Sequence, residues 1–170
     1  MNFKTKIDNA AIQKVLNKLE ELSEPVNQRT AREVASEVVS KMKESISSGK
    51  SPILGNGNFD PYRGQYRARI QRYGRIGEHT KKLRPVNLTL SGAFLESLKG
   101  TVAKVKSGYA AVIGFSDKKS QKKEQGHREG ANGQAERPII PQSGEKFSLV
   151  IQNVYLDIIN ERIATIAKRK

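Results

Sequence analysis

The C-terminal part of the chain carries its longest apolar pattern, and this pattern limits the folds open to the rest. Apolar residues recur about every four positions at Phe147, Ile151, Tyr155, Ile159, Ile163 and Ile166, with Val150, Val154 and Ile158 beside them. This period predicts an α-helix of roughly 25 residues, capped by Ser143, with Leu149 and Leu156 off the stripe. Because the band is wider than a small sheet usually covers, we expect part of it to pack on other helices.

Two N-terminal helices are predicted to supply that partner surface. The first spans residues 8–22 with Asp8 as its N-cap, and the second runs from about Pro25 or Thr30 to Ile46. The first stripe consists of Ile12, Val15, Leu16, Leu19 and Leu22. The second consists of Ala31, Val34, Ala35, Val38, Val39, Met42 and Ile46.

A short helix and a β-hairpin are predicted between the second N-terminal helix and the C-terminal helix. Ser91 is placed to cap a helix over residues 93–98, and Gly100 stands where a left-handed C-cap residue is wanted. Strands over 101–106 and 109–115 then flank Ser107–Gly108, where glycine can supply the positive φ of a tight turn. The second strand has Tyr109, Ala111, Ile113 and Phe115 on one face, and the small residues Ala110, Val112 and Gly114 on the other. The small face would allow a helix or strand to approach closely.

The segment after the hairpin is polar. Asp117 can cap residues 118–125, but these lack an apolar stripe, so a helix there would be exposed or held by a partner subunit. Residues 126–135 are predicted to be a flexible loop, which makes 116–135 a polar loop. Pro138 and Pro141 then bracket an extended segment that could pair only at a sheet edge, because proline has no N–H to donate.

The densest positive charge follows the second helix. Residues 50–64 are rich in turn-forming glycine, proline and asparagine. Residues 62–85 then carry eight basic residues against the single acid Glu78, a net charge of +7. The eight are Arg63, Arg67, Arg69, Arg72, Arg75, Lys81, Lys82 and Arg84. With three interleaved tyrosines they suit contacts to nucleic acid or to a partner. An equally weighted and compatible interpretation is a short helix that buries Tyr66, Ile70 and Tyr73.

Composition narrows the function classes. The 170 residues suit a single α+β domain, 1–170, with an extended basic arm or loop at 50–85. A net charge of +14 favours an anionic partner such as nucleic acid, although a basic surface can also serve solubility alone. The chain has no cysteine and no apolar run of membrane-spanning length. We expect no membrane partner.

The sequence offers few candidate catalytic or metal-binding residues. His127 and Glu129 form a weak candidate pair without a third ligand, and the acidic residues of the N-terminal helices are expected to be solvated faces. We therefore expect a non-enzymatic protein with no catalytic, metal-binding or cofactor-binding residues and no cofactor.

Several short motifs resemble those of the virion-morphogenesis or tail-completion proteins of tailed bacteriophages, over roughly residues 50–165. They are Leu88-Thr89-Leu90-Ser91-Gly92 with Leu95 and Ser97, then His127-Arg128-Glu129-Gly130, then Arg137-Pro138 before a long helix. The sequence departs from the family pattern at Ile139, where the family usually has an aromatic residue, and in lacking an aromatic residue near the histidine.

The resemblance implies a structural subunit of the virion that is assembled in the host cytoplasm. Such subunits form an oligomeric ring at the head–tail connector, the neck or the tail end, and bind copies of themselves and other connector and tail proteins. The basic segment at 50–85 corresponds to a variable arm that contacts neighbours, and double-stranded DNA in the channel is a further candidate partner. The alternative is a non-catalytic nucleic-acid-binding accessory protein, which explains the charge equally well.

Overall fold

A computed structural model describes residues 13–17, 19–20, 26–73, 75–76, 79–80, 82, 85–88, 92–106 and 108–168. Its elements, in chain order, are α2 (Gln28–Ser47), α3 (Gly64–Tyr73), β1 (Arg75–Ile76), β2 (His79–Thr80), α4 (Ala93–Glu96), β3 (Leu98–Val105), β4 (Gly108–Phe115), α5 (Lys118–Arg128), a 3-10 turn (Ala131–Gly133) and α6 (Leu149–Lys168). The predicted α+β class, with a small antiparallel sheet and long helices, is confirmed.

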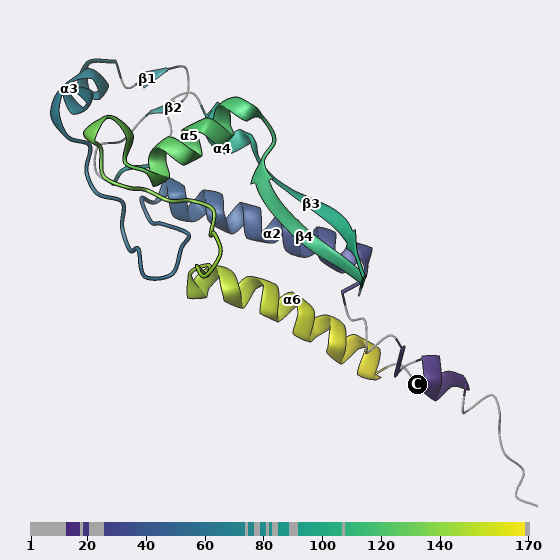
Figure 1. The fold of residues 1–170 in the computed structure, drawn as a ribbon. Helices are drawn as coiled ribbons and strands as arrows, with labels where there is room; N and C mark the ends of the chain where they lie inside the picture. The colour runs from purple at the N-terminus through teal and green to yellow at the C-terminus, as the bar shows by residue number, and fades with distance from the viewer. Residues whose placement is uncertain are drawn as a thin grey trace, which may run out of the picture.

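Helix α2 is the centre of the molecule. The β3–β4 hairpin packs on one side of it and α6 packs on the other (Figure 1). The predicted α2 stripe is buried throughout, from Ala31 to Ile46, which accounts for contacts on both sides. The helix begins with Asn27 as N-cap, whose side chain accepts a hydrogen bond from the Thr30 N–H at 2.9 Å. Helix α2 therefore begins at Gln28, between the two predicted starts at Pro25 and Thr30.

The hairpin is longer than predicted. Its apolar face packs against α2, as expected. Leu98 pairs with Phe115 and Val105 pairs with Gly108, so the first strand begins three residues earlier than predicted and the second begins one residue earlier. Gly108 has a φ of +119°, the positive value that the turn was expected to need. Phe115 is buried and Ala111 and Ile113 pack against the core.

Gly100 has a different role from the one predicted. It lies inside β3 and is not a helix C-cap, because the short helix ends at Glu96 and Ser97 follows as its C-cap. A Cβ atom built on Gly100 would lie 2.4 Å from the carbonyl oxygen of Ala35 in α2. Close approach of the sheet to the helix therefore depends on this glycine in β3, and the small face of β4 points away, with Val112 exposed.

The predicted polar loop at 116–135 contains a helix. Asp117 caps α5 by accepting a hydrogen bond from the Ser120 N–H at 2.8 Å, which also lowers the pKa of its carboxyl group. The helix is held within its own chain, since Gln121 donates to the Phe115 carbonyl oxygen at 3.0 Å and the His127 ring lies 5.6 Å from the Phe94 ring. A side-chain hydrogen bond and an aromatic contact thus hold α5 in place, although it has no apolar stripe.

Helix α6 starts at Leu149, later than predicted, because the preceding residues are extended. Ile53 and Phe147 form an antiparallel bridge, the Leu54 N–H donates to Lys146 O at 2.9 Å, and the Ser148 N–H donates to Pro52 O at 2.8 Å. The expected packing on the second helix is confirmed, with Ile151 and Ile166 buried.

Parts of the predicted α6 stripe are exposed. Val150 and Ile163 were expected to be buried but are exposed, whereas Leu149 and Leu156 are exposed as predicted. In the N-terminal segment, residues 13–17 and 19–20 are helical, and Val15, Leu16 and Leu19 are each more than half exposed. These three residues do not provide the partner surface that was expected of the first helix.

Gly100→Ala should destabilise the protein because the added methyl group meets the α2 backbone, which cannot move as a flexible side chain could. We expect the free energy of unfolding in urea to fall by about 1–3 kcal/mol. Gly114→Ala is the matched control in the paired strand, since its Cβ would meet nothing within 4 Å. Equal stability of the two variants would contradict the close approach of β3 to α2.

Candidate functional site

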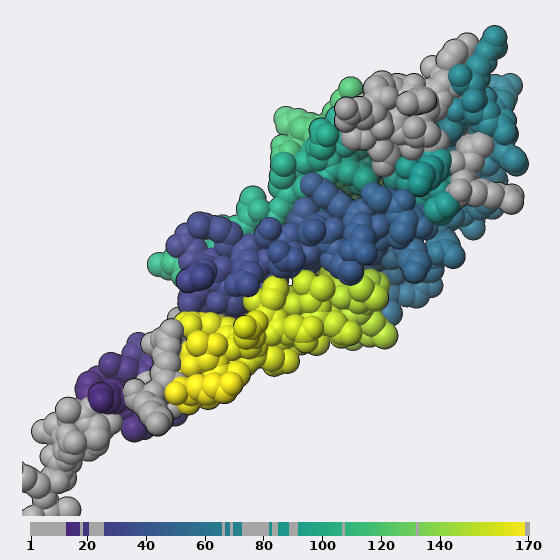
Figure 2. Space-filling model, turned by 180° about the vertical axis from the view of Figure 1, so that it is seen from behind, coloured from purple at the N-terminus to yellow at the C-terminus, as the bar shows by residue number. Residues whose placement is uncertain are grey.

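The basic segment lies at one end of the molecule. Helix α3 and the β1–β2 pair are at the end opposite the C-terminal end of α6 (Figures 1 and 2). Arg63, Arg67 and Arg72 are exposed on and beside α3, and exposed Lys82 follows β2 by two residues. We call these four residues the basic surface. Arg69 lies in α3 and Arg75 in β1, but their side chains lie outside the described part, as do Lys81 and Arg84 altogether.

Helix α3 is docked on the core by Ile70. This residue is buried and belongs to the main apolar cluster, as the helical interpretation of the segment predicted. The side chains of Tyr66 and Tyr73, expected beside it, lie outside the described ones. Since Arg67 and Arg72 point to solvent from the same helix, the helical and the partner-binding interpretations are compatible.

The base of this segment is held by a buried arginine. The Arg137 side chain is 1% exposed. Its Nε and Nη2 donate to the Asp60 carbonyl oxygen at 3.1 and 2.8 Å, and Nη2 also donates to the Pro61 carbonyl oxygen at 3.1 Å. Its Nη1 donates to the Ala135 carbonyl oxygen at 3.0 Å. The fork of guanidinium N–H groups thus ties residues 60–61 to the segment before α6.

An aromatic contact completes the Arg137 site. The guanidinium carbon lies 4.7 Å from the centre of the Tyr62 ring, and Tyr62 is 3% exposed. A cation over an aromatic face is stabilised by the ring quadrupole, more so where water is excluded. The site therefore fixes three consecutive residues, Asp60 to Tyr62, immediately before the basic surface begins.

A second contact holds the next residue. The side-chain amide of Gln134 accepts a hydrogen bond from the Arg63 N–H at 3.1 Å and donates to the Arg63 carbonyl oxygen at 3.3 Å. The amide thus pairs with the Arg63 main chain as a neighbouring strand would. Since the Ser51 hydroxyl also donates to the Pro138 carbonyl oxygen at 3.1 Å, residues 134–138 contact the 50–63 segment at three places.

These contacts correct two predictions. The 50–85 segment was expected to be an extended arm or loop, but Phe59, Tyr62 and Ile70 belong to the core. The segment around Ile139 was predicted to be extended and a possible sheet edge, but it forms no strand, and Ile139 is fully buried in the core. Both segments are ordered by packing on each other, a long-range effect that local patterns do not contain.

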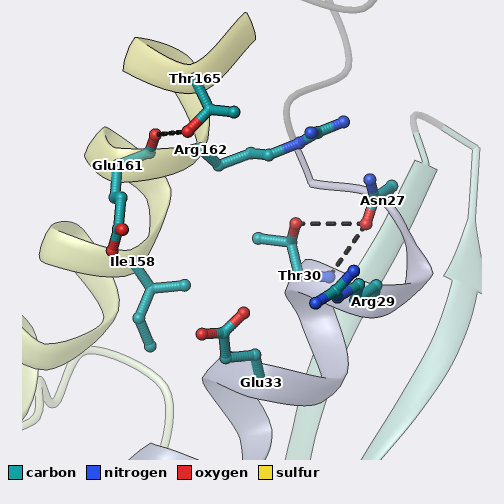
Figure 3. Close-up of a pocket in the computed structure, with 8 residues that line it drawn as sticks. All are labelled: Asn27, Arg29, Thr30, Glu33, Ile158, Glu161, Arg162 and Thr165. Carbon is teal, nitrogen blue, oxygen red and sulfur yellow. Dashed lines mark hydrogen bonds between the residues drawn. The ribbon is translucent and has the colours of Figure 1, made fainter.

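A cleft of about 340 Å³ lies between the first turn of α2 and the C-terminal half of α6 (Figure 3). Its lining mixes acids with arginines, and the residues are Asn27, Arg29, Thr30, Glu33, Ile158, Glu161, Arg162 and Thr165. Two of its polar groups are used locally, because Thr30 donates to Asn27 and Thr165 donates to the Glu161 carbonyl oxygen. The first turn of α2 and the C-terminal half of α6, which line this cleft, lie at the end of the molecule opposite α3 (Figure 1).

His127 and Glu129, the weak candidate pair, are placed on α5 and at its C-cap. His127 packs against Phe94 and its carbonyl oxygen accepts the Arg137 N–H at 2.6 Å, so it supports the Arg137 site through its main chain. Within the described ranges, no group of three or more His, Asp or Glu side chains is arranged to hold a metal ion. The helices of the same ranges include none long and apolar enough to cross a bilayer.

An ion pair joins α5 to the segment before α6. Arg128 Nη1 lies 3.1 and 3.0 Å from the two carboxylate oxygens of Glu145, and its Nη2 donates to the Ile140 carbonyl oxygen. The Gln142 N–H also donates to Glu145 at 2.8 Å. This main-chain hydrogen bond, with the help of Arg128, holds the pKa of Glu145 below its ordinary value of 4.5, although partial burial acts in the opposite direction.

The structure identifies Arg137, Gln134 and Tyr62 as positioning residues. Sequence reasoning did not assign Arg137 or Gln134 to the site, and it counted Tyr62 among the three interleaved tyrosines suited to contact nucleic acid, whereas Tyr62 is buried under Arg137. The only sequence signal for Arg137 was its place before Pro138 in a motif of the resemblance. Nothing in the pattern around Gln134 or Tyr62 distinguishes them from other polar or aromatic residues. What the assembled site can do chemically is present fixed positive charge to a polyanion or to an acidic protein surface.

Arg137→Met should loosen the base of α3. It removes the hydrogen-bond donors to the carbonyl oxygens of Asp60, Pro61 and Ala135. Each buried carbonyl group left without a donor destabilises the folded state. We expect the free energy of unfolding to fall by about 3 kcal/mol or more, with faster amide exchange at residues 59–64. Arg63→Met, which removes an exposed arginine, serves as control and should change stability by less than about 0.5 kcal/mol. Unchanged exchange at 59–64 in Arg137→Met would contradict this role.

Glu145→Gln should change the pH dependence of stability. A carboxyl group with a lowered pKa stabilises the folded state above its unfolded pKa, and this contribution disappears as the pH falls through the folded pKa. The wild type should therefore be more stable than the variant at pH 7, and the difference should shrink as the pH falls below 4.5. Urea titrations of both proteins across this range measure the effect, and a difference independent of pH would contradict it.

Comparisons with known proteins add no identity to this geometry. No protein-family model matches the chain, and no curated protein or solved structure shows significant similarity to it.

Proposed function

We propose that this protein is a structural subunit of a tailed-phage particle, assembled in the host cytoplasm and retained in the virion. Several copies form a ring at the head–tail connector, neck or tail end, where they bind other connector and tail proteins. The basic surface of each copy faces neighbouring subunits or the DNA in the channel. No chemical reaction is assigned to it.

The observation that carries the proposal is the buried Arg137 site. Arg137 belongs to the Arg-Pro motif through which the sequence resembles tail-completion proteins. Its guanidinium group fixes Asp60 and Pro61, directly before the basic surface. A structural subunit needs its contact surface held in place before assembly, because a mobile surface would lose conformational entropy on binding.

The order of the elements supports the same proposal. A long helix, a basic segment, a short helix, a hairpin, an Arg-Pro segment and a second long helix follow one another as the resemblance implies. The basic surface lies at one end of the molecule, on α3 and beyond β2, away from the C-terminal end of α6. A ring of such subunits with this end inward would line its channel with arginine and lysine, which contact phosphates without reading bases.

Assembly in the absence of DNA tests the proposal. We expect native mass spectrometry and negative-stain electron microscopy of the purified protein to reveal closed rings. The accessory-protein alternative predicts a monomer that binds nucleic acid tightly, and that outcome would contradict the ring. A salt-sensitive interaction with DNA alone does not separate the two, because a chain of net charge +14 would show it in either case.

The basic surface should contribute a sequence-independent part of DNA binding. In a triple variant with Arg67→Gln, Arg72→Gln and Lys82→Gln, we expect the slope of log affinity against log salt to become shallower. The change should be about 0.9 for each phosphate that the variant no longer neutralises, and equal for unrelated duplex sequences. The rings themselves should still form if these residues face the DNA channel.

A second triple variant is the control for net charge. Lys99→Gln, Lys104→Gln and Lys106→Gln remove the same three charges from exposed positions of the hairpin and its turn. We expect a smaller change in slope than for the α3 variant. Equal changes would mean that only the total charge matters and that the basic surface has no special place in DNA binding.

A further inference from the structure

Helix α5 presents four lysines to solvent, outside the basic surface already described. All four are exposed, and they are Lys118, Lys119, Lys122 and Lys123. At about 100° per residue, they lie within an arc of about 140° on the helix surface. We call them the lysine face. The helix that carries them lies on the hairpin side of α2, away from α6 (Figure 1).

The opposite side of α5 holds the helix on its own chain. Its residues lie within an arc of about 100° and are partly or fully buried, and they are Ser120, Glu124, His127 and Arg128. The His127 ring lies 5.6 Å from the Phe94 ring, and Arg128 lies 3.0 Å from a carboxylate oxygen of Glu145. Because this side fixes the rotation of α5, the lysine face has a defined direction toward solvent.

The lysine face is unfavourable for the stability of α5. Lys118 lies four residues before Lys122, and Lys119 lies four before Lys123, a spacing at which like charges repel each other on a helix. The first turn has no acidic residue, so its two lysines lie at the positive end of the helix dipole. The N-cap Asp117 offsets part of this charge. Charges placed against the stability of their own helix indicate a role in binding.

We propose that the lysine face binds the phosphate backbone of a nucleic acid without reading its bases. Flexible ammonium groups on two turns of one helix can each neutralise a phosphate and release its counterion. A bound phosphate backbone also offsets the repulsion between lysines four residues apart, so α5 is more stable in the complex than in the free protein.

The side chains of α5 that could read bases are used within the protein. The Gln121 amide donates to the Phe115 carbonyl oxygen at 3.0 Å, and the Gln125 amide donates to Glu129 at 2.9 Å. The Arg128 guanidinium group is held by Glu145. The lysine face therefore offers point charges, which suit phosphates and carry no sequence preference.

The composition of the lysine face fits a nucleic acid better than an acidic protein surface. Protein–protein interfaces are rich in aromatic residues, methionine and arginine, and poor in lysine. The one further residue of α5 within the arc of the lysines is Gly126, which has no side chain. An acidic protein would gain little apolar contact there, whereas a phosphate backbone requires only charge.

This contact goes beyond the proposed function and is separable from it. It requires a single copy of the chain, and its residues lie on α5, whereas the basic surface lies on and beside α3 and beyond β2. Rings whose α5 lysines take no part in DNA binding would contradict only the present inference. A monomer that binds DNA through α5 would contradict only the ring.

Lysine acetylation in the presence of DNA tests the contact on the unaltered protein. We expect a DNA duplex to protect Lys118, Lys119 and Lys122 from acetylation several-fold, as measured by mass spectrometry, and to do so equally for unrelated sequences. The control lysines of the hairpin and its turn are also exposed and should keep their reactivity, and they are Lys99, Lys104 and Lys106. Equal protection of both sets, or no protection on α5, would overturn the proposal.

A triple variant separates binding from stability. With Lys118→Gln, Lys119→Gln and Lys122→Gln, the slope of log affinity for DNA against log salt should become shallower by about 0.9 for each lost phosphate contact. This change should exceed that of the hairpin triple variant, which removes the same charge. Stability in urea should not fall, because the variant removes repulsion within α5. A less stable variant would mean that the lysines hold the fold, and equal slopes would mean that only total charge matters. Either result would overturn the proposal.

Poly-glutamate distinguishes a nucleic acid from an acidic protein. At equal salt we expect the wild type to bind duplex DNA more tightly than poly-glutamate, and the α5 variant to lose affinity mainly for DNA. An equal loss of affinity for both polyanions would assign the lysine face to an acidic protein partner and would overturn the proposal.

Discussion

The buried guanidinium group of Arg137 connects two irregular segments of this protein, residues 50–63 and residues 134–148. Its N–H groups reach main-chain oxygens of Asp60, Pro61 and Ala135, so one side chain orders segments that are more than seventy residues apart in the sequence. Burial of a charge is strongly unfavourable unless polar partners surround it. The carbonyl dipoles and the Tyr62 ring provide that environment. In return, three carbonyl groups in irregular backbone gain donors that no regular ladder supplies.

Helix α2 provides the framework on which this connection is built. It separates the hairpin from α6, and its stripe is wide enough to be buried on both sides. The distance between sheet and helix depends on Gly100, which lies over the Ala35 backbone. With the helix, hairpin and α6 packed in this way, residues 52–54 can pair with residues 146–148. This pairing determines where α6 begins.

The arrangement separates charge from apolar contact. The basic surface lies at one end of the molecule, whereas the exposed apolar residues of α6, Leu149, Leu156 and Ile163, lie along its side. The cleft between α2 and α6 is a third feature, lined by Arg29 and Glu33 of α2 and by Glu161 and Arg162 of α6 (Figure 3).

The sequence by itself determined the elements whose order is local. The stripe of α2, the hairpin with Gly108 at its turn and the buried side of α6 all follow from periodicity and backbone preference. Tertiary structure alone decided the role of Gly100, the burial of Ile139 and Phe59, and the helix α5 that lacks an apolar stripe. The reason is physical: a period records which face of an element is apolar, but the atoms that meet a given residue come from distant parts of the chain. The Arg137 site is the clearest case, because its main-chain partners could be any carbonyl groups and leave no trace in residue type.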